Sequence, residues 1–556
     1  MKIAIIKKYI DMQKKQCLAC HRTYTVYPKD LLYFQKIGVT VPDLCFRCNQ
    51  IKLLAWRNER FFYLRKCDQC GKKIVSCYNE HAAHPVFCND CWWSDNFNAL
   101  QYGRDFNFNR TFFEQFGDLL KDTPVGNLIN AKAVNSEYTN LSVSNNNCYM
   151  LVASDYNENC SYCSYTSYNK DSLDCTETKN CELCYDSVDL EKCYQCRWSQ
   201  NLHSCNHCNF CRDCRGCTDC LGCANLRNQN NCLFNKKYTK DDYVKKVAKY
   251  QLNTQSGLQK FQNEFNKFKE KQFFLFSQNL NCEQVSGDYL TNCQNCQNCF
   301  SMLDCTNCTN CLHGDKAKDC YGSMGIINAE LIYNSLACPE NNNIQFSPVV
   351  WPGSYNIRYS YMIRTAQNCF GCVSLHNNSY CLLNKQYSES EYKKIMPKVI
   401  AHMKKTGEWG QFFPMNICPF AYNETAGQDL FPLTKEEVQA TFGGRWLEQR
   451  DQEKKSVSNN IDIFLCENCH KDFKLIKQEI EFYKRQQIPF PRLCFNCRHL
   501  RRMNLRTVKD LWKRQCMCTQ PTHNHYGRCT NEFETTYSPN RKELIYCVDC
   551  YNKEIY

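Results

Sequence analysis

Cysteine recurs in a strict three-residue register through the middle of this 556-residue chain. All sixteen cysteines from Cys148 to Cys232 share the register, and between Cys205 and Cys223 one stands at every third position. Many of them also recur every twelve residues, as at Cys184, Cys196 and Cys208. A twelve-residue period with inward side chains at every third residue predicts a narrow β-solenoid, in which each rung is one turn of the chain.

The lumen of such a solenoid accepts only small or apolar side chains, and Ser172 and Leu190 fill inward positions that lack cysteine. Cysteine suits the lumen because it is compact and behaves as a buried apolar group. We favour reduced, packed thiols, with cross-lumen disulfides and bound metal as the alternatives. The period is similar to that of the twelve-residue-rung antifreeze solenoids of insects, but the chain lacks their outward Thr-x-Thr array, so ice binding is not implied.

A second stretch, from Cys293 to Cys320, keeps the same register and predicts a second solenoid block. Both blocks end on similar text, since "GCANLRNQNNCLFNKKYTKDDY" and "GCVSLHNNSYCLLNKQYSESEY" align without a gap. Each leads into a Lys-rich helical pattern. The sequence therefore predicts that a capping helix begins at Thr239 and another at Ser388, residue types that favour helix N-termini.

The two ends of the chain are copies of each other. Each has two Cys-x-x-Cys pairs at the same spacing, a pattern in which two tight turns aim four thiolates at one zinc ion. The predicted ligands are Cys17, Cys20, Cys45 and Cys48 in front, and Cys466, Cys469, Cys494 and Cys497 at the rear. Both segments resemble the treble-clef-like zinc-ribbon family in their order of Cys pair, aromatic-rich hairpin, Pro, Cys pair and Arg, which implies the same zinc site.

A second zinc site is expected in each copy, which makes about four ions in all. The front site is assigned to Cys67, Cys70, Cys88 and Cys91, with Cys77, His81 and His84 as bystanders. The rear site uses Cys529, Cys547 and Cys550, and ten inserted residues precede Cys529. Its fourth ligand is Cys516 by duplication, which we favour, or one of the inserted Cys518, His523 and His525.

The basic surplus of the chain, whose net charge is +13, lies in its ends. Lys and Arg outnumber Asp and Glu by 16 to 7 in residues 1–91 and by 17 to 11 in residues 461–556. Arginines follow the second Cys pairs at spacings that would line a helix face, and we expect Arg501 and Arg502 to be more exposed than Leu500. These arginines predict contact with RNA, DNA or a ribonucleoprotein, the alternative being an ordinary solvated helix: Arg57, Arg60, Arg498, Arg501, Arg502 and Arg506.

The predicted fold class is mixed α+β, with small zinc modules at both ends of a two-block solenoid. The expected segments are a double zinc-ribbon module (1–100), a helical connector (101–145), solenoid block 1 (146–238), a helical insert (239–278), solenoid block 2 (279–387), a helical or irregular segment (388–450), a linker (451–460) and a second double zinc-ribbon module (461–556).

These features favour a zinc-binding, non-catalytic scaffold with protein partners on the solenoid. The alternative is a metal-dependent or thiol-redox enzyme, or a metal buffer, which the 47 cysteines favour. Against an enzyme stand the 12 histidines, the missing His-Glu zinc signature and sites closed by four thiolates. We expect a reducing, cytoplasmic location, because neither a signal peptide nor a membrane-spanning run is recognisable.

The order of segments, with "GEWGQFFP", "YNETA" and "FPLTKEE", resembles an uncharacterised family of large Cys-rich proteins from ultra-small candidate-phylum bacteria. Members sometimes carry a label of CaiB/BaiF-type CoA transferase. This sequence does not support that label, since it shows neither a nucleotide-binding Gly-rich loop nor an acyl-transfer constellation. The resemblance implies an architecture without an activity.

Overall fold

A computed structural model describes residues 12–448, 463–523 and 525–556, so the predicted linker 451–460 lies outside the described residues. The chain divides into two compact units, neither continuous in sequence. Unit 1 comprises Met1–Leu128 and Ser277–Glu448, and unit 2 comprises Ile129–Phe276 and Gln449–Tyr556. Each unit thus combines one solenoid block with the Cys-rich module from one end of the chain, called here the front module (12–100) and the rear module (463–556). The finer predicted boundaries stay a prediction.

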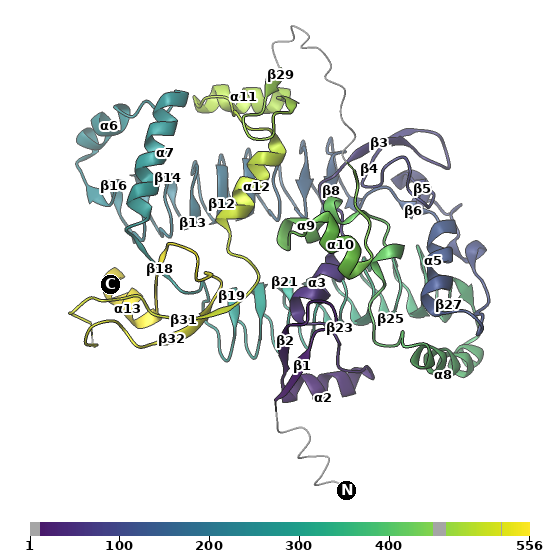
Figure 1. Ribbon diagram of the computed structural model, residues 1–556. Coiled ribbons are helices and arrows are strands. Elements are labelled where there is room, and N and C mark those ends of the chain that lie inside the picture. The colour runs from purple at the N-terminus through teal and green to yellow at the C-terminus, as the bar shows by residue number, and fades with distance from the viewer. Residues whose placement is uncertain (1–11, 449–462, 524) are drawn as a thin grey trace. The chain divides into compact units, whose positions relative to one another are not determined.

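Unit 2 contains block 1 and the rear module (Figure 1). The strands of block 1 are β7 (Asn130–Ala131), β8 (Thr139–Asn140), β9 (Ser142–Val143), β10 (Leu151–Val152), β11 (Leu173–Lys179), β12 (Tyr185–Glu191), β13 (Gln200–His203), β14 (Asn206–Asn209), β15 (Thr218–Leu221), β16 (Asn230–Leu233) and β17 (Lys236–Lys237). Helices α6 (Lys240–Ala248) and α7 (Gln255–Lys269) and strand β18 (Phe273–Leu275) follow. The rear module contains β29 (Ile463–Leu465), β30 (Asp472–Lys474), α11 (Lys477–Gln486), α12 (Phe495–Leu505), β31 (Trp512–Gln515), β32 (Glu532–Thr535), β33 (Leu544–Tyr546) and α13 (Val548–Ile555).

Unit 1 contains the front module and block 2. Its first part has β1 (Gln13–Gln16), β2 (Thr23–Val26), α2 (Pro28–Ile37), α3 (Phe46–Leu54), β3 (Tyr63–Lys66), β4 (Lys73–Ser76), β5 (Val86–Phe87), α4 (Asn89–Trp92), α5 (Phe112–Asp122) and β6 (Val125–Gly126). Block 2 has β19 (Gly287–Thr291), β20 (Cys299–Leu303), β21 (Leu312–Asp315), β22 (Met324–Ile327), β23 (Glu330–Tyr333), β24 (Asn342–Gln345), β25 (Tyr355–Arg358), β26 (Gln367–Phe370), β27 (Cys381–Leu382) and β28 (Lys385–Gln386). Helices α8 (Glu389–Lys405), α9 (Ala426–Leu430) and α10 (Lys435–Phe442) complete the unit.

The predicted β-solenoid is confirmed, with about 21 turns in the two blocks together. Parallel pairing joins residues twelve apart, as in Cys208 with Cys220 and Cys220 with Cys232. Block 2 keeps the same step from Ile332 to Ile344 and lengthens one rung to thirteen residues before Ile357. Both predicted caps form, since α6 begins after Thr239 and α8 after Ser388. None of the described helices combines the length and apolar content needed to span a bilayer.

Left-handed backbone recurs at the residue before each inward position, which turns the chain at every corner of a rung. The φ angles of Asn147, Asn159 and Asp171 lie between 48° and 52°, a conformation that Asn and Asp adopt more readily than other non-glycine residues. The side chains in this column also bond to one another: Asn147 donates to Asn159 at 3.3 Å and Asn159 donates to Asp171 at 3.0 Å. Stacked polar corners therefore stabilise the outside of the solenoid, a feature that the cysteine pattern did not predict.

The lumen of block 1 is packed with thiols. Cys208, Cys211 and Cys220 are at most 1% exposed and lie in one continuous core. The Cys208 thiol donates to the carbonyl oxygens of Asn206 at 3.4 Å and Cys217 at 3.5 Å. Each thiol is thus both an apolar packing group and a weak donor to the wall, and every cysteine in the described chain is free.

Replacing Cys208 with alanine should lower the free energy of unfolding of unit 2 by about 1–2 kcal/mol, because it removes one buried group from a packed lumen. Chemical denaturation measures the loss, and metal analysis should find the bound metal unchanged. Asn206→Ala, an exposed position on the same rung, serves as the control. Release of a metal ion by Cys208→Ala would show instead that the lumen is a coordination site.

Candidate metal centres

Four groups of four cysteines have their sulfur atoms within 4.8 Å of one another, two in each module. In the part of the chain that the structure describes, groups of this kind occur in the modules and not in the solenoid lumen. They contain all sixteen predicted ligands: Cys17, Cys20, Cys45 and Cys48; Cys67, Cys70, Cys88 and Cys91; Cys466, Cys469, Cys494 and Cys497; and Cys516, Cys529, Cys547 and Cys550. These clusters are positioned as metal-binding sites.

One local architecture builds all four groups. Two cysteines lie in the connection of a two-stranded antiparallel hairpin, formed by β1–β2, β3–β4, β29–β30 or β31–β32. The other two belong to the N-terminal end of a short helix, where Cys45, Cys88, Cys494 and Cys547 are the N-cap residues of α3, α4, α12 and α13. Free N–H groups and the positive end of the helix dipole favour thiolates there.

Backbone hydrogen bonds also prepare the hairpin thiols for a metal. The N–H group of Cys494 donates to the Cys466 sulfur at 3.3 Å, and that of Cys88 donates to the Cys67 sulfur at 3.2 Å. Burial raises the pKa of Cys466, but backbone hydrogen bonds, from Cys469 and Cys494 first, outweigh it and bring the pKa down to about 6. The same balance lowers the pKa of Cys67 to about 7. In each of these two groups one hairpin thiol is therefore already disposed to lose its proton, whereas burial raises the pKa of the helix thiols Cys88 and Cys494.

The rear module contains a further group that the sixteen ligands do not cover. Cys518, His523, His525 and Cys550 also have ligand atoms within 4.8 Å of one another. The structure thus places Cys516, rather than one of the inserted residues, with the other three cysteines of the rear site. The inserted residues form their own group, and Cys550 belongs to both.

The six arginines predicted to contact nucleic acid form ion pairs with carboxylates of the chain itself. In the rear module the side chains of Arg498 and Arg502 are 2% and 1% exposed, whereas Leu500 is 45% exposed. The expectation that Arg502 is more exposed than Leu500 was therefore wrong, whereas Arg501, with a side chain 48% exposed, is as exposed as Leu500. Arg498 and Arg502 are buried because α12 packs against β11 and β12 of the solenoid through its arginine face (Figure 1).

Acidic residues of block 1 form ion pairs with the arginine face of α12. Asp174 is fully buried and forms ion pairs of 2.7 Å with Arg498 and 2.8 Å with Arg502. Asp186 pairs with Arg501, and Glu177 pairs with Arg506 at 2.8 Å. Burial lowers the pKa of Arg498, but the surrounding carboxylates, Asp174 first, outweigh it, and that pKa lies well above its ordinary value. Asp174 and Asp186 are one rung apart. This twelve-residue repeat of acidic residues is the sequence signal that could have predicted the packing of α12 on block 1.

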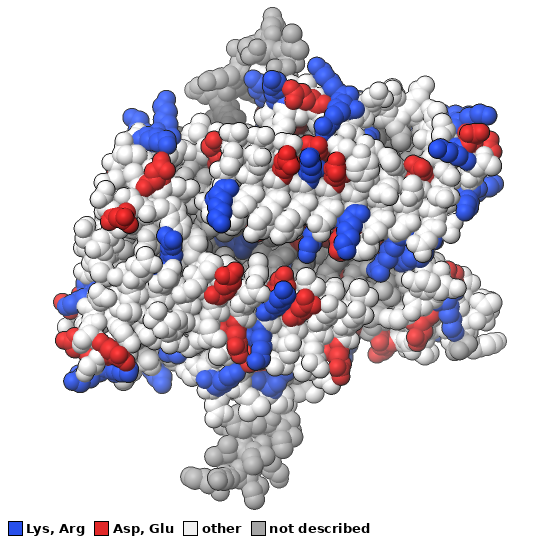
Figure 2. All heavy atoms as spheres, turned by 180° about the vertical axis from the view of Figure 1, so that it is seen from behind, with Lys and Arg blue, Asp and Glu red and all other residues white. Residues whose placement is uncertain are grey.

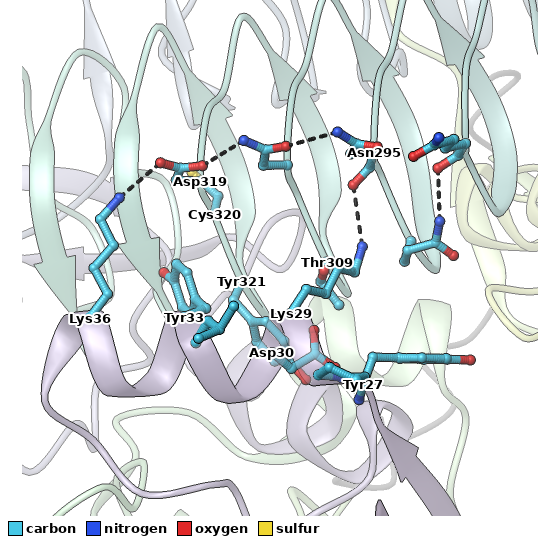
Figure 3. Close-up of a pocket in the computed structure, with 15 residues that line it drawn as sticks. Tyr27, Lys29, Asp30, Tyr33, Lys36, Asn295, Thr309, Asp319, Cys320 and Tyr321 are labelled. Carbon is cyan, nitrogen blue, oxygen red and sulfur yellow. Dashed lines mark hydrogen bonds and ion pairs between the residues drawn. The ribbon is translucent and has the colours of Figure 1, made fainter. Parts of the chain in front are cut away.

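The front module docks on block 2 by different contacts within unit 1. Arg57 pairs with Glu59 and Arg60 with Asp429, so these arginines too are engaged internally. Beside α2 lies a groove of about 780 Å³ (Figure 3), where Lys36 forms an ion pair of 3.0 Å with Asp319. The Asp319 carboxylate also ends an amide ladder that runs through Asn307. The groove has a mixed lining that includes Leu32 and Tyr33, and its lysines Lys29 and Lys36 already bond to block 2, to the Asn295 carbonyl oxygen and to Asp319.

On the face shown in Figure 2, basic and acidic side chains are interspersed over the described surface, without a broad area of one sign. Comparison with protein-family models gives no match, and no curated protein matches the chain. The function has to be argued from the sites themselves.

Proposed function

We propose that this protein is a zinc-dependent, non-catalytic scaffold. Each metal-bound module packs on the β-solenoid block of its own unit, and the blocks present binding surfaces to protein partners. One observation carries the proposal. Helix α12 holds Cys494 and Cys497 at its first turn and, on the same helix, the arginines that bind Asp174 in the solenoid wall. A metal ion that fixes the start of this helix also fixes the arginine contacts with the solenoid, so the role of the ion is structural.

Zinc is the ion that fits best. The sulfur atoms of Cys20 and Cys45 are 3.7 Å apart, and those of Cys70 and Cys88 are 3.8 Å apart. Tetrahedral zinc with Zn–S bonds of about 2.3 Å separates its thiolates by about 3.8 Å. Four thiolates fill the coordination shell and leave no place for a substrate or an activated water, which argues against metal-dependent catalysis.

Metal and thiol analysis tests the scaffold against the thiol-redox or metal-buffering alternative. Protein prepared without oxygen should be colourless and hold at least four zinc ions per chain, whereas iron–sulfur clusters would give colour. A thiol reagent should react faster with Cys282, which is half-buried and lies outside the metal groups, than with the buried lumen thiols. Burial raises the pKa of one of these, Cys148, to about 12. Cys282→Ser is the control.

Two results would instead favour the alternative: rapid reaction of many lumen thiols in the folded protein, or fast release of zinc to a weak chelator. Contact with RNA, DNA or a ribonucleoprotein also stays a prediction, supported by the basic surplus of the ends. Five of the six arginines are at most 11% exposed and form ion pairs within the chain, so they have no counterions to release to a phosphate backbone. The prediction now needs Arg501, whose side chain is 48% exposed, or other basic side chains. Salt-dependent binding of nucleic-acid probes by the intact chain would support it.

A further inference from the structure

The ten residues inserted ahead of Cys529 bring two histidines and a cysteine to the rear tetra-Cys group. The Cys518 sulfur lies 3.1 Å from Nδ1 of His523, and the Cys550 sulfur lies 3.5 Å from Nε2 of His525. Cys518 and Cys550 are buried, and His523 is only 7% exposed. Two imidazoles and two thiols that converge in a buried place form a Cys₂His₂ ligand set, one of the usual sets for structural zinc.

The far side of each imidazole has a partner that orients it toward this centre. Nε2 of His523 lies 3.5 Å from the carboxylate of Glu554, and Nδ1 of His525 lies 2.9 Å from the carbonyl oxygen of Gly527. Both partners can accept a hydrogen bond, and a proton on the outer nitrogen of each ring would turn the lone pair of the inner nitrogen toward the thiols. Metal-binding histidines are held in this way by an outer carboxylate or carbonyl. Glu554 also lies on α13, one turn beyond Cys550.

Cys550 belongs to both the tetra-Cys group and the Cys₂His₂ group. A thiolate has more than one lone pair and can bind two ions at once, so the two groups need not compete for it. We propose that the rear module binds a third metal ion, of the zinc class, at Cys518, His523, His525 and Cys550, and that the Cys550 thiolate bridges this ion and the ion of the neighbouring tetra-Cys group. This inference rests on the proposed zinc binding of the tetra-Cys group.

The ion at the Cys₂His₂ group gives the insertion a role in the rear module. It joins the segment after β31, which carries Cys518, to α13, which carries Cys550 and Glu554. In the front module the corresponding hairpin connects Cys67 and Cys70 directly, without such an insertion. The two modules would therefore differ in metal content, with two separate ions in front and three ions at the rear, two of them bridged.

Metal analysis of the full chain tests the bridged pair. Wild-type protein should hold five zinc ions per chain, and His523→Ala/His525→Ala should hold one fewer. His203→Ala/His207→Ala, which removes two half-exposed histidines from the solenoid of the same unit, should keep all five. Cys518→Ser should also lose one ion, and it leaves every ligand of the tetra-Cys group in place.

Cobalt substitution gives a second readout that does not depend on counting. Two Co²⁺ ions bridged by a thiolate couple magnetically. The electron paramagnetic resonance signal of the wild type should therefore be smaller than the summed signals of the same number of isolated Co²⁺ ions. The histidine variant should lose this coupling. Equal metal contents in the wild type, the histidine variant and Cys518→Ser, with no magnetic coupling, would overturn the inference while zinc binding by the tetra-Cys groups stood. A wild type without zinc in either module would overturn the proposed function itself.

Discussion

Replacing Asp174 with alanine should cost unit 2 about 3–5 kcal/mol, because it leaves the guanidinium groups of Arg498 and Arg502 buried without the carboxylate that they share. Glu479 remains 2.7 Å from Arg498, but the nearest carboxylate left to Arg502 would be Asp186, at 3.7 Å, beside its neutral hydrogen-bond partners Thr176 and Tyr162. A charge that loses its partner in a buried place costs far more than the pair contributes over an apolar core. Chemical denaturation followed by circular dichroism measures the change.

Asp219→Ala is the matched control, because Asp219 lies on the same solenoid with a side chain 41% exposed beside His207. Its effect should stay within about 1–2 kcal/mol, the cost of placing alanine in left-handed backbone, and Asp174 at φ 55° and Asp219 at φ 50° share this cost. A quadruple variant, Asp174→Asn/Glu479→Gln/Arg498→Met/Arg502→Leu, removes the buried charges together and should recover most of the lost stability, since uncharged residues of similar volume can replace a buried ionic cluster. If Asp174→Ala and Asp219→Ala prove equally mild, the arginine dock does not hold the rear module to the solenoid.

The rung length and the ligand groups could be predicted because each follows from the number of residues between successive cysteines in the sequence. A side chain that recurs every twelve residues in a parallel solenoid has to meet its own copies, so the pairing of Cys208 with Cys220 follows directly from the period. Two Cys-x-x-Cys turns likewise specify a tetrahedron of thiolates wherever the hairpin and the helix meet. Local geometry decides both features, and no distant segment is needed.

Where the arginines point could not be predicted from local spacing. A basic helix face is equally compatible with solvent, nucleic acid or a row of carboxylates, and the choice depends on which segment packs against it. Here the row belongs to block 1, more than 300 residues away along the chain, where Asp174 forms an ion pair with Arg498. The pairing of front module with block 2 and rear module with block 1 is of the same kind.

The shared role of Cys550 was missed for a different reason. Duplication alone assigned Cys516 to the fourth place of the rear site, and the inserted Cys518, His523 and His525 entered only as competitors for that place. The structure shows a second convergence of ligand atoms beside the first. Choosing one ligand among four candidates could not reveal that all four lie at metal-binding positions.

Replacing Cys45 with alanine should remove one zinc ion and unfold the start of the front module, the largest change that we expect from a single substitution. Cys45 is the N-cap of α3, and Gln50 on the same helix donates to the carbonyl oxygen of Gly322 in block 2 at 3.1 Å. Structural zinc contributes about 10–16 kcal/mol of apparent binding free energy in zinc-finger peptides. The site should therefore lose both its ion and its folded hairpin. Metal analysis and limited proteolysis of the β1–β2 region measure the two losses.

Cys77→Ala provides the control in the same module. Cys77 is buried like Cys45, but its thiol donates to the carbonyl oxygen of Asn127 at 3.3 Å and lies outside the metal groups. Removing it should cost about 1–2 kcal/mol and leave the zinc content and the proteolysis pattern unchanged. Because both variants delete one buried thiol, only metal coordination separates them. A Cys45→Ala protein that kept its full zinc content and resisted protease would show that packing, and not an ion, holds α3 on the solenoid.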